Sequence, residues 1–238
     1  MTGVVLLSAA LFTNGFSQTQ KTIHTNYQFW TSINTIARVN KHWAVIGDVH
    51  IRRNHFAADP GFYFVRTGAG YYVNKNFYVV AGYGHMWLAS EVQQHYLFAG
   101  ENRIYEQAQY TLKFKKAGIT QRIRNEQRWQ QKIVNGKPSA YNHFSDRIRY
   151  LLSISVPVFK NENLPVPVIS DEAAVHFGRD IIYNRFDQNR IFLGIKQKIS
   201  KTLSFDFGYM NLYQNKYTRG QADDNHTFRL FFYYNPHL

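Results

Sequence analysis

The sequence of 238 residues contains no cysteine, only 6 prolines and few acidic residues. Without cysteine there can be no disulfide scaffold, zinc finger or thiol nucleophile. The 15 Asp and Glu residues are outnumbered by 28 Lys and Arg residues, which gives a formal net charge of +13. Intrinsic disorder is excluded as well, because 17 tyrosines, 19 phenylalanines and 4 tryptophans supply abundant apolar surface to bury.

Long apolar runs are missing too, and no segment after residue 17 approaches the ~18 apolar residues of a transmembrane helix. The apolar run at 4–12 is too short to span a bilayer, and Gly15 and Ser17 beyond it suit a cleavage site. We therefore expect residues 1–17 to be a secretory signal peptide and Gln18 to begin the mature chain. The alternative is a buried amino-terminal strand or short helix.

Apolar and polar residues alternate along most of the remaining chain. Within residues 42–53, for example, Val49 follows Asp48, and the same alternation runs through 144–156 and 189–199. A period of two over about ten residues marks a strand with one apolar and one polar face. No apolar stripe with helical spacing persists long enough to predict a helix.

This alternation predicts eleven strands. They are 25–38, 42–53, 62–73, 77–88, 100–115, 119–131, 144–157, 166–177, 188–199, 203–214 and 226–235. Their connections alternate between short turns (39–41, 74–76, 116–118, 160–165 and 200–202) and long polar loops (54–61, 89–99, 132–143, 178–187 and 215–225). Strands of roughly twelve residues, with short turns at one end of the barrel and long loops at the other, are typical of outer-membrane barrels.

The predicted fold is therefore all-β: a transmembrane, antiparallel, up-and-down barrel of 10–12 strands over residues 18–238, in the cell outer membrane. Aromatic residues near strand ends fit interfacial belts. They are Trp43, Tyr71, Phe77, Trp87, Trp129 and Phe144. Because bacterial single-chain barrels have even strand numbers, we expect ten or twelve strands. Either 18–25 begins a further strand, 25–38 is two short strands, or one segment lies outside the wall.

If the apolar rows face lipid, the lumen is strongly basic. The predicted lumenal cations are Arg52, Arg66, Arg103, Arg122, Arg124, Arg128, Arg147, Arg149, Arg190, Lys196, Lys198 and Arg229, with Asp48, Glu126, Glu172 and Asp206 as acidic partners. These side chains could simply fill a narrow interior. Alternatively, they line a small, porin-like, anion-selective pore or a site for an acidic ligand such as a lipid phosphate.

Two other functional classes remain open. The first is an outer-membrane lipid or lipopolysaccharide hydrolase. Ser170, Glu172 and His176 share a strand face, but six residues at ~3.3 Å separate the serine from the histidine by ~20 Å. A cross-strand triad with His50, His85 or His143 would be needed instead.

The second class is a structural or accessory subunit of an envelope complex. Glu106, Asn125 and Gln127 fall on the apolar row, where hydrocarbon would make them costly. We therefore expect them above the membrane, on a projecting wall that could dock a partner. No cofactor, metal site or nucleic-acid partner is predicted, because the histidine spacings lack a zinc pattern and the arginines are dispersed over many strands.

Several segments resemble a known family. They are 186–195 (FDQNRIFLGI), 203–210 (LSFDFGYM), 102–107 (NRIYEQ) and 122–129 (RIRNEQRW). The chain resembles an uncharacterised domain-of-unknown-function family of small outer-membrane β-barrels from Bacteroidetes-type Gram-negative bacteria. The resemblance implies a fold and a location among outer-membrane lipid and lipopolysaccharide, but no reaction. It also implies that the aromatic last strand, 225–234, is recognised by the barrel-assembly machinery during insertion.

Overall fold

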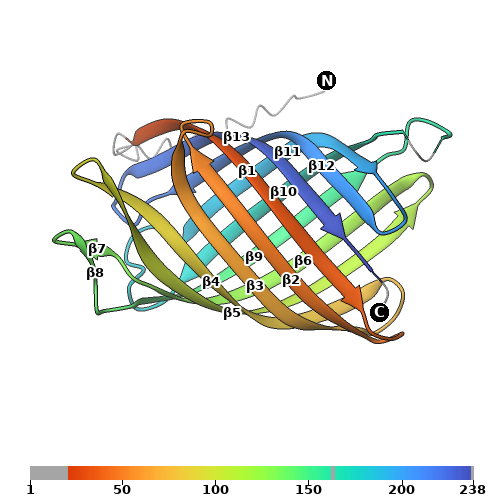
Figure 1. Cartoon of the computed structure of the whole chain (residues 1–238), viewed down its shortest axis with the longest axis horizontal. Coiled ribbons are helices and arrows are strands. Elements are labelled where there is room, and N and C mark those ends of the chain that lie inside the picture. The colour runs from red at the N-terminus through yellow and green to blue at the C-terminus, as the bar shows by residue number, and fades with distance from the viewer. Residues whose placement is uncertain (1–20, 162–163, 237–238) are drawn as a thin grey trace, which may run out of the picture.

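The computed structural model describes residues 21–161 and 164–236, so the predicted signal peptide (1–17) lies outside the described residues. Eleven strands form one closed barrel (Figure 1). They are β1 (Thr22–Arg38), β2 (Trp43–Asn54), β3 (Asp59–Tyr72), β4 (Phe77–Val92), β5 (His95–Phe114), β6 (Ala117–Gln130), β9 (His143–Ser155), β10 (Val166–Phe177), β11 (Phe186–Lys198), β12 (Leu203–Asn215) and β13 (Gln221–Tyr234). None of the described residues belongs to a helix long and apolar enough to cross a membrane.

The barrel closes by pairing its first strand with its last. Every other neighbouring pair is antiparallel, whereas β1 and β13 run parallel, from Thr22 opposite Gln221 to Thr35 opposite Tyr234. The all-β barrel and the range of ten to twelve strands are confirmed, but the expectation of an even number is wrong. With eleven alternating strands the first and last point the same way, so only a parallel seam can close the wall.

The connections are sorted by length less strictly than the sequence suggests. The predicted loop 89–99 is a continuation of the β4–β5 hairpin, in which Gln93 and Gln94 alone form the turn at positive φ. The predicted loop 215–225 is shorter, because β13 begins at Gln221. The connection between β6 and β9 contains a small hairpin, β7 (Ile133–Val134) and β8 (Lys137–Pro138), which projects from one end of the barrel (Figure 1).

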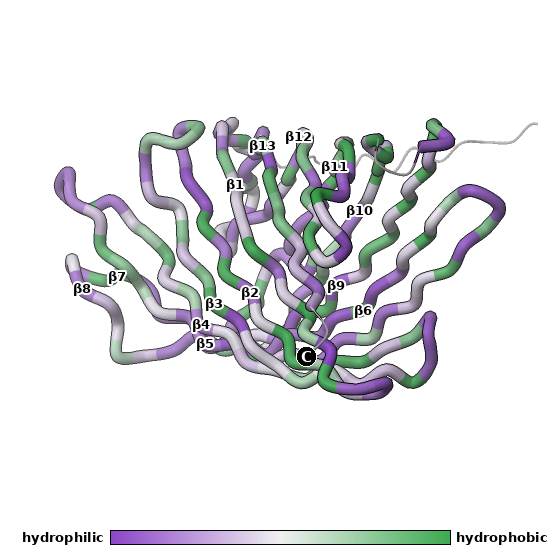
Figure 2. The backbone as a smooth tube through the Cα atoms, turned by 45° about the vertical axis from the view of Figure 1, so that its right-hand side comes forward, coloured by the Kyte–Doolittle hydropathy of each residue, from purple (hydrophilic) through white to green (hydrophobic). Residues whose placement is uncertain are grey.

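The barrel wall is apolar outside and charged inside, the reverse of a water-soluble core. Hydrophilic and hydrophobic residues alternate along the strands (Figure 2). Exposed hydrophobic residues on the outer face include Val45, Val49, Val65, Ile104, Ile123, Ile148, Ile169, Ile191, Leu193, Phe207 and Phe228. Buried charged residues include Asp48, Glu101, Arg103, Arg124, Glu126, Arg128, Arg147, Arg149, Glu172, Asp187 and Asp206.

The outer face also carries polar residues, such as Asp171 on β10, which accepts a hydrogen bond from Asn189, and a polar group on β5 and β6. Glu106 accepts hydrogen bonds from Asn125 and Gln127, both at 3.3 Å. The strand ladder sets Glu106 opposite Ala81 and Asn125, in the shared middle of the wall. The expectation that these residues stand on a projecting wall is therefore wrong, because the part of β5 that extends past its neighbour β6 comes earlier, before Gly100.

Glycines make room for large side chains inside the barrel. Tyr105, on β5, is 2% exposed and crosses over the backbone of β3 and β4. A Cβ at Gly82 would lie 2.2 Å from the carbonyl oxygen of Thr67 and 2.7 Å from the Tyr105 ring. Neither neighbour can move without breaking the β3–β4 ladder or the packing of the ring.

We expect Gly82→Ala to destabilise the barrel by ~1–3 kcal/mol through overpacking. The matched control is Gly47→Ala on β2, where an added Cβ meets nothing within 4 Å. Urea unfolding of the barrel refolded in detergent measures both. Equal stability of the two variants would contradict this packing.

Candidate functional site

The lumen is a single cavity of about 990 Å³ whose lining extends from one rim of the barrel to the other. Lys216 and Thr218 line it at the rim that carries the β12–β13 loop, and Ser155 and Asn235 line it at the opposite rim. Between them, one wall carries mostly arginines and carboxylates from β5, β6, β9 and β10. The facing wall, from β1–β3 and β11–β13, carries more aromatic side chains.

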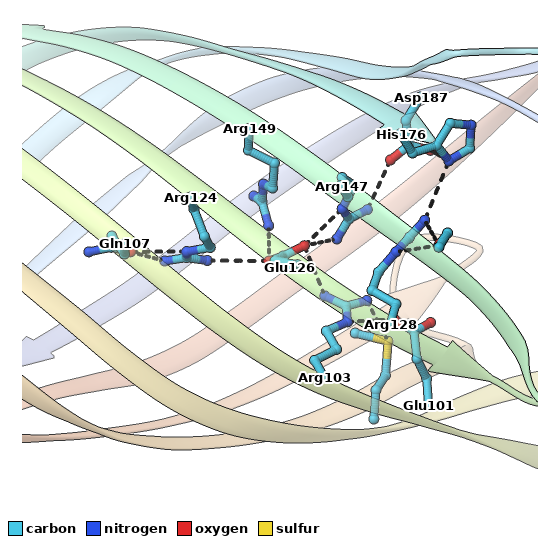
Figure 3. Close-up of polar contacts among 12 residues, drawn as sticks. Glu101, Arg103, Gln107, Arg124, Glu126, Arg128, Arg147, Arg149, His176 and Asp187 are labelled. Carbon is cyan, nitrogen blue, oxygen red and sulfur yellow. Dashed lines mark hydrogen bonds and ion pairs between the residues drawn. The ribbon is translucent and has the colours of Figure 1, made fainter. Parts of the chain in front are cut away.

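Glu126 is the centre of the charged wall (Figure 3). It is 2% exposed, and its Oε2 accepts hydrogen bonds from Nε (2.8 Å) and Nη2 (2.5 Å) of Arg147. Its Oε1 accepts a 3.0 Å hydrogen bond from Arg149, and the guanidinium groups of Arg124 and Arg103 lie at 3.7 and 3.8 Å. The Glu126 carboxylate thus contacts four arginines. All four side chains point into the lumen, because alternate residues of a strand lie on the same face.

Glu172, on β10, is the second shared carboxylate. It accepts hydrogen bonds from Arg122 at 2.5 Å and from Arg190 at 3.2 Å, and it also pairs with Arg149. Because Arg149 contacts both Glu126 and Glu172, the two groups form one continuous network. The two carboxylates of this network, Glu126 and Glu172, form ion pairs with arginines on β5, β6, β9 and β11.

Four further ion pairs complete the interior, two of them formed by arginines that also contact Glu126. They are Arg66 with Asp48, Arg103 with Glu101, Arg147 with Asp187, and Arg229 with Asp206, which also accepts a 2.5 Å hydrogen bond from Tyr233. All four are charge-assisted hydrogen bonds, and Arg66 and Arg229 each donate from two guanidinium nitrogens.

Positive charge remains in excess in the lumen. Within the described residues, Arg52, Arg128 and Lys196 line the cavity without a carboxylate oxygen within 4.0 Å. Arg128 donates instead to Ser145 at 2.9 Å, and the Lys196 ammonium lies 5.3 Å from the Tyr233 ring centroid. An unbalanced interior of this kind attracts anions.

Outside the wall, at the rim of the β2–β3 loop, His55 contacts Asp59. This hydrogen bond, together with one from Tyr96 of the β4–β5 hairpin, lowers the pKa of the Asp59 carboxyl below its usual value. The contact between Tyr96 and Asp59 joins the tip of the β4–β5 hairpin to the β2–β3 loop.

The structure puts the predicted lumenal cations around the cavity, except Lys198, which is exposed at the end of β11 and does not line it. Sequence reasoning missed two buried acids, Glu101 and Asp187. Glu101 shares the parity of Arg103 on its strand and could have been found from that. Asp187 lies next to the irregular register between Ala174 and Val175, where simple alternation fails.

Two of the residues considered for a hydrolase triad, Glu172 and His176, are engaged elsewhere. Glu172 is taken by arginines, and His176 contacts the carbonyl oxygen of Asn184 and lies 3.4 Å from Arg128. Across residues 21–161 and 164–236, no serine hydroxyl is hydrogen-bonded to a histidine ring. The described geometry therefore does not assemble the nucleophile and base that such a mechanism needs.

Fold and lumen together define a closed β-barrel with a largely apolar outer face and an arginine-rich interior cavity. The chain belongs to the family described as "Protein of unknown function (DUF2490)", whose model matches residues 27–223, from within β1 to within β13. None of the curated proteins with which the chain was compared matches it.

We expect Glu126→Gln to cost ~3–5 kcal/mol of stability, because it leaves Arg147 and Arg149 buried beside a neutral amide. The control is Glu106→Gln on the outer face of the neighbouring strand, which should be near neutral. Urea unfolding in detergent compares the two. A Glu126→Gln barrel as stable as the control would mean that the network contributes little to folding.

Proposed function

We propose that the protein is an integral outer-membrane β-barrel whose arginine-lined lumen conducts small anions. The observation that carries the proposal is the inverted polarity of the wall, with large hydrophobic residues exposed and charged residues buried. In water, such an outer face would favour aggregation, whereas in a bilayer its hydrophobic side chains lie against lipid tails and the polar group around Glu106 is bonded within itself.

The dimensions of the wall support a membrane location. Tyr63 and Tyr71 both face outward on β3 and are separated by eight residues, or ~26 Å along the strand and ~20 Å along the axis of a barrel tilted by ~40°. Trp43 packs edge-on against Tyr71 near one rim, and Trp129 packs against Phe144 near the other. Two aromatic groups at this separation match an apolar band ~25 Å tall.

The lumen supports conduction of anions in particular. Its lining reaches both rims, and Arg52, Arg128 and Lys196 add positive charge without a carboxylate oxygen within 4.0 Å in the described part of the chain. Low-dielectric walls strengthen the resulting field, which draws anions in and repels cations. The extensive pairing of the other arginines keeps the passage narrow but does not remove its positive sign.

The membrane part of the proposal predicts a depth-dependent cost for charge on the outer face. Val49 (49% exposed, mid-wall) and Val73 (50% exposed, in the β3–β4 turn) are matched in type and exposure. In lipid vesicles Val49→Arg should cost ~2–4 kcal/mol and Val73→Arg ~0–1 kcal/mol. In a water-soluble protein both would lie within ~0.5 kcal/mol of wild type, and a purified chain that stays monomeric without detergent would overturn the location.

The channel part predicts an anion-selective current in planar bilayers. Under a KCl gradient, the reversal potential should favour chloride, and Arg128→Gln combined with Lys196→Gln should reduce that preference by about twofold or more. Lys137→Gln, in the projecting hairpin, is the control and should leave selectivity unchanged. A barrel that inserts but carries no current, or one that prefers potassium, would refute the channel.

A further inference from the structure

Arg52 is the exception among the arginines of the lumen. In the described part of the chain, every other lumenal arginine donates a hydrogen bond to a carboxylate, amide or hydroxyl. The partners are Asp48 for Arg66, Glu101 for Arg103, Glu172 for Arg122 and Arg190, Gln107 for Arg124, Ser145 for Arg128, Glu126 for Arg147 and Arg149, and Asp206 for Arg229. The Arg52 side chain makes no hydrogen bond or ion pair with any described residue, and its Nε is buried without a partner.

Aromatic rings, rather than acceptors, hold Arg52 in place. Its guanidinium carbon lies 3.4 Å from the ring centroid of Trp30 and 4.2 Å from that of Phe62. The Trp30 ring is itself fixed, because its indole N–H donates a 2.9 Å hydrogen bond to Gln28 and the residue belongs to a buried cluster with Phe192 and Met210. Gln28 in turn donates to Asn225 at 3.0 Å. The aromatic rings therefore hold the Arg52 guanidinium in a defined position, although it has no hydrogen-bond acceptor among the described residues.

Stacking of this kind has a direct chemical consequence. Contacts with the rings engage the face of the guanidinium, whereas all five N–H donors of arginine lie in its plane. Those donors have no protein acceptor here, yet the group lines the cavity. Leaving charged donors unpaired in a partly desolvated place is costly, so the site calls for an acceptor from the lumen.

Neighbouring groups restrict what that acceptor can be. Arg190 lies 5.4 Å from the centroid of the same Trp30 ring, which brings a second cation to the site. His50, two residues away on the same face of β2, has an Nδ1 without a partner. A fixed guanidinium fork beside a second cation matches an anionic group with two oxygens in a plane, such as a carboxylate or a phosphate.

We propose that Arg52, assisted by Arg190, binds the oxyanion group of a small solute, a carboxylate or a phosphate, inside the lumen. The inference rests on the proposed function only in requiring that solutes reach the lumen. It goes beyond that function, because a pore with a diffuse positive field would show no saturable preference for oxyanions over chloride.

The test is calorimetric titration of the full-length barrel, refolded in detergent micelles, with sodium phosphate, sodium acetate and sodium chloride at constant ionic strength. We expect saturable binding of phosphate or acetate, and the better of the two identifies the oxyanion. Chloride should give no saturable heat over the same range. Absence of saturable binding of both oxyanions by the folded wild-type barrel would overturn the proposal.

Three variants assign the binding to Arg52. Arg52→Gln should weaken it by about tenfold or more, and Arg52→Lys should also weaken it, because lysine keeps the charge but loses the fork. The control is Arg53→Gln on the same strand, since Arg53 faces the other way and donates to the carbonyl oxygens of Ala57 and Ala58. If Arg52→Gln bound the oxyanion with wild-type affinity, the proposed site at Arg52 would be refuted.

The two proposals fail separately. Selective chloride current without saturable oxyanion binding would refute the Arg52 site and leave the channel standing. Saturable binding that depends on Arg52, in a barrel that carries no current, would support the site and refute conduction.

Discussion

Closure of the wall at the seam between β1 and β13 is the constraint on which the rest of this structure depends. Once β1 pairs with β13, the wall has no free edge, and the backbone groups of both strands are satisfied within one sheet. A closed wall one strand thick leaves each side chain only two directions. Every residue must point into the lumen or away from the barrel, so the period-two pattern becomes a division between two environments. The charged interior and the apolar exterior both follow from this division.

The interior then has to accommodate many long cations with few acids. It does so by sharing, since Glu126 and Glu172 each contact several arginines, and Arg149 joins them. Shared carboxylates make the wall of β5, β6, β9 and β10 well defined, because several of its guanidinium groups, such as those of Arg147 and Arg149, are held at more than one point. The opposite wall uses aromatic rings for the same purpose. The charges that this interior leaves without a carboxylate among the described residues, on Arg52, Arg128 and Lys196, also line the cavity.

Much of this fold was predictable from sequence, and the failures have physical causes. Alternation identified all eleven barrel strands, because burial on one face imposes a period of two wherever the ladder is regular. The two-residue turn at Gln93 and Gln94 escaped notice, since glutamine is not a residue that ordinarily signals positive φ. Asp187 was missed because a register irregularity interrupts the alternation on which its prediction would depend. The isolation of Arg52 could not be predicted at all, because it depends on which cross-strand neighbours supply acceptors and which supply rings.

The odd number of strands also fixes how the chain enters and leaves the barrel. Thr22 lies beside Gly220, in the β12–β13 loop, whereas Asn235 lies beside Thr202, in the β11–β12 turn at the opposite rim. A barrel with an even count would bring the start of its first strand and the end of its last strand to one rim. Here a membrane around the barrel would separate these two points, so that an antibody epitope at the front of β1 and another behind β13 would be accessible from different compartments.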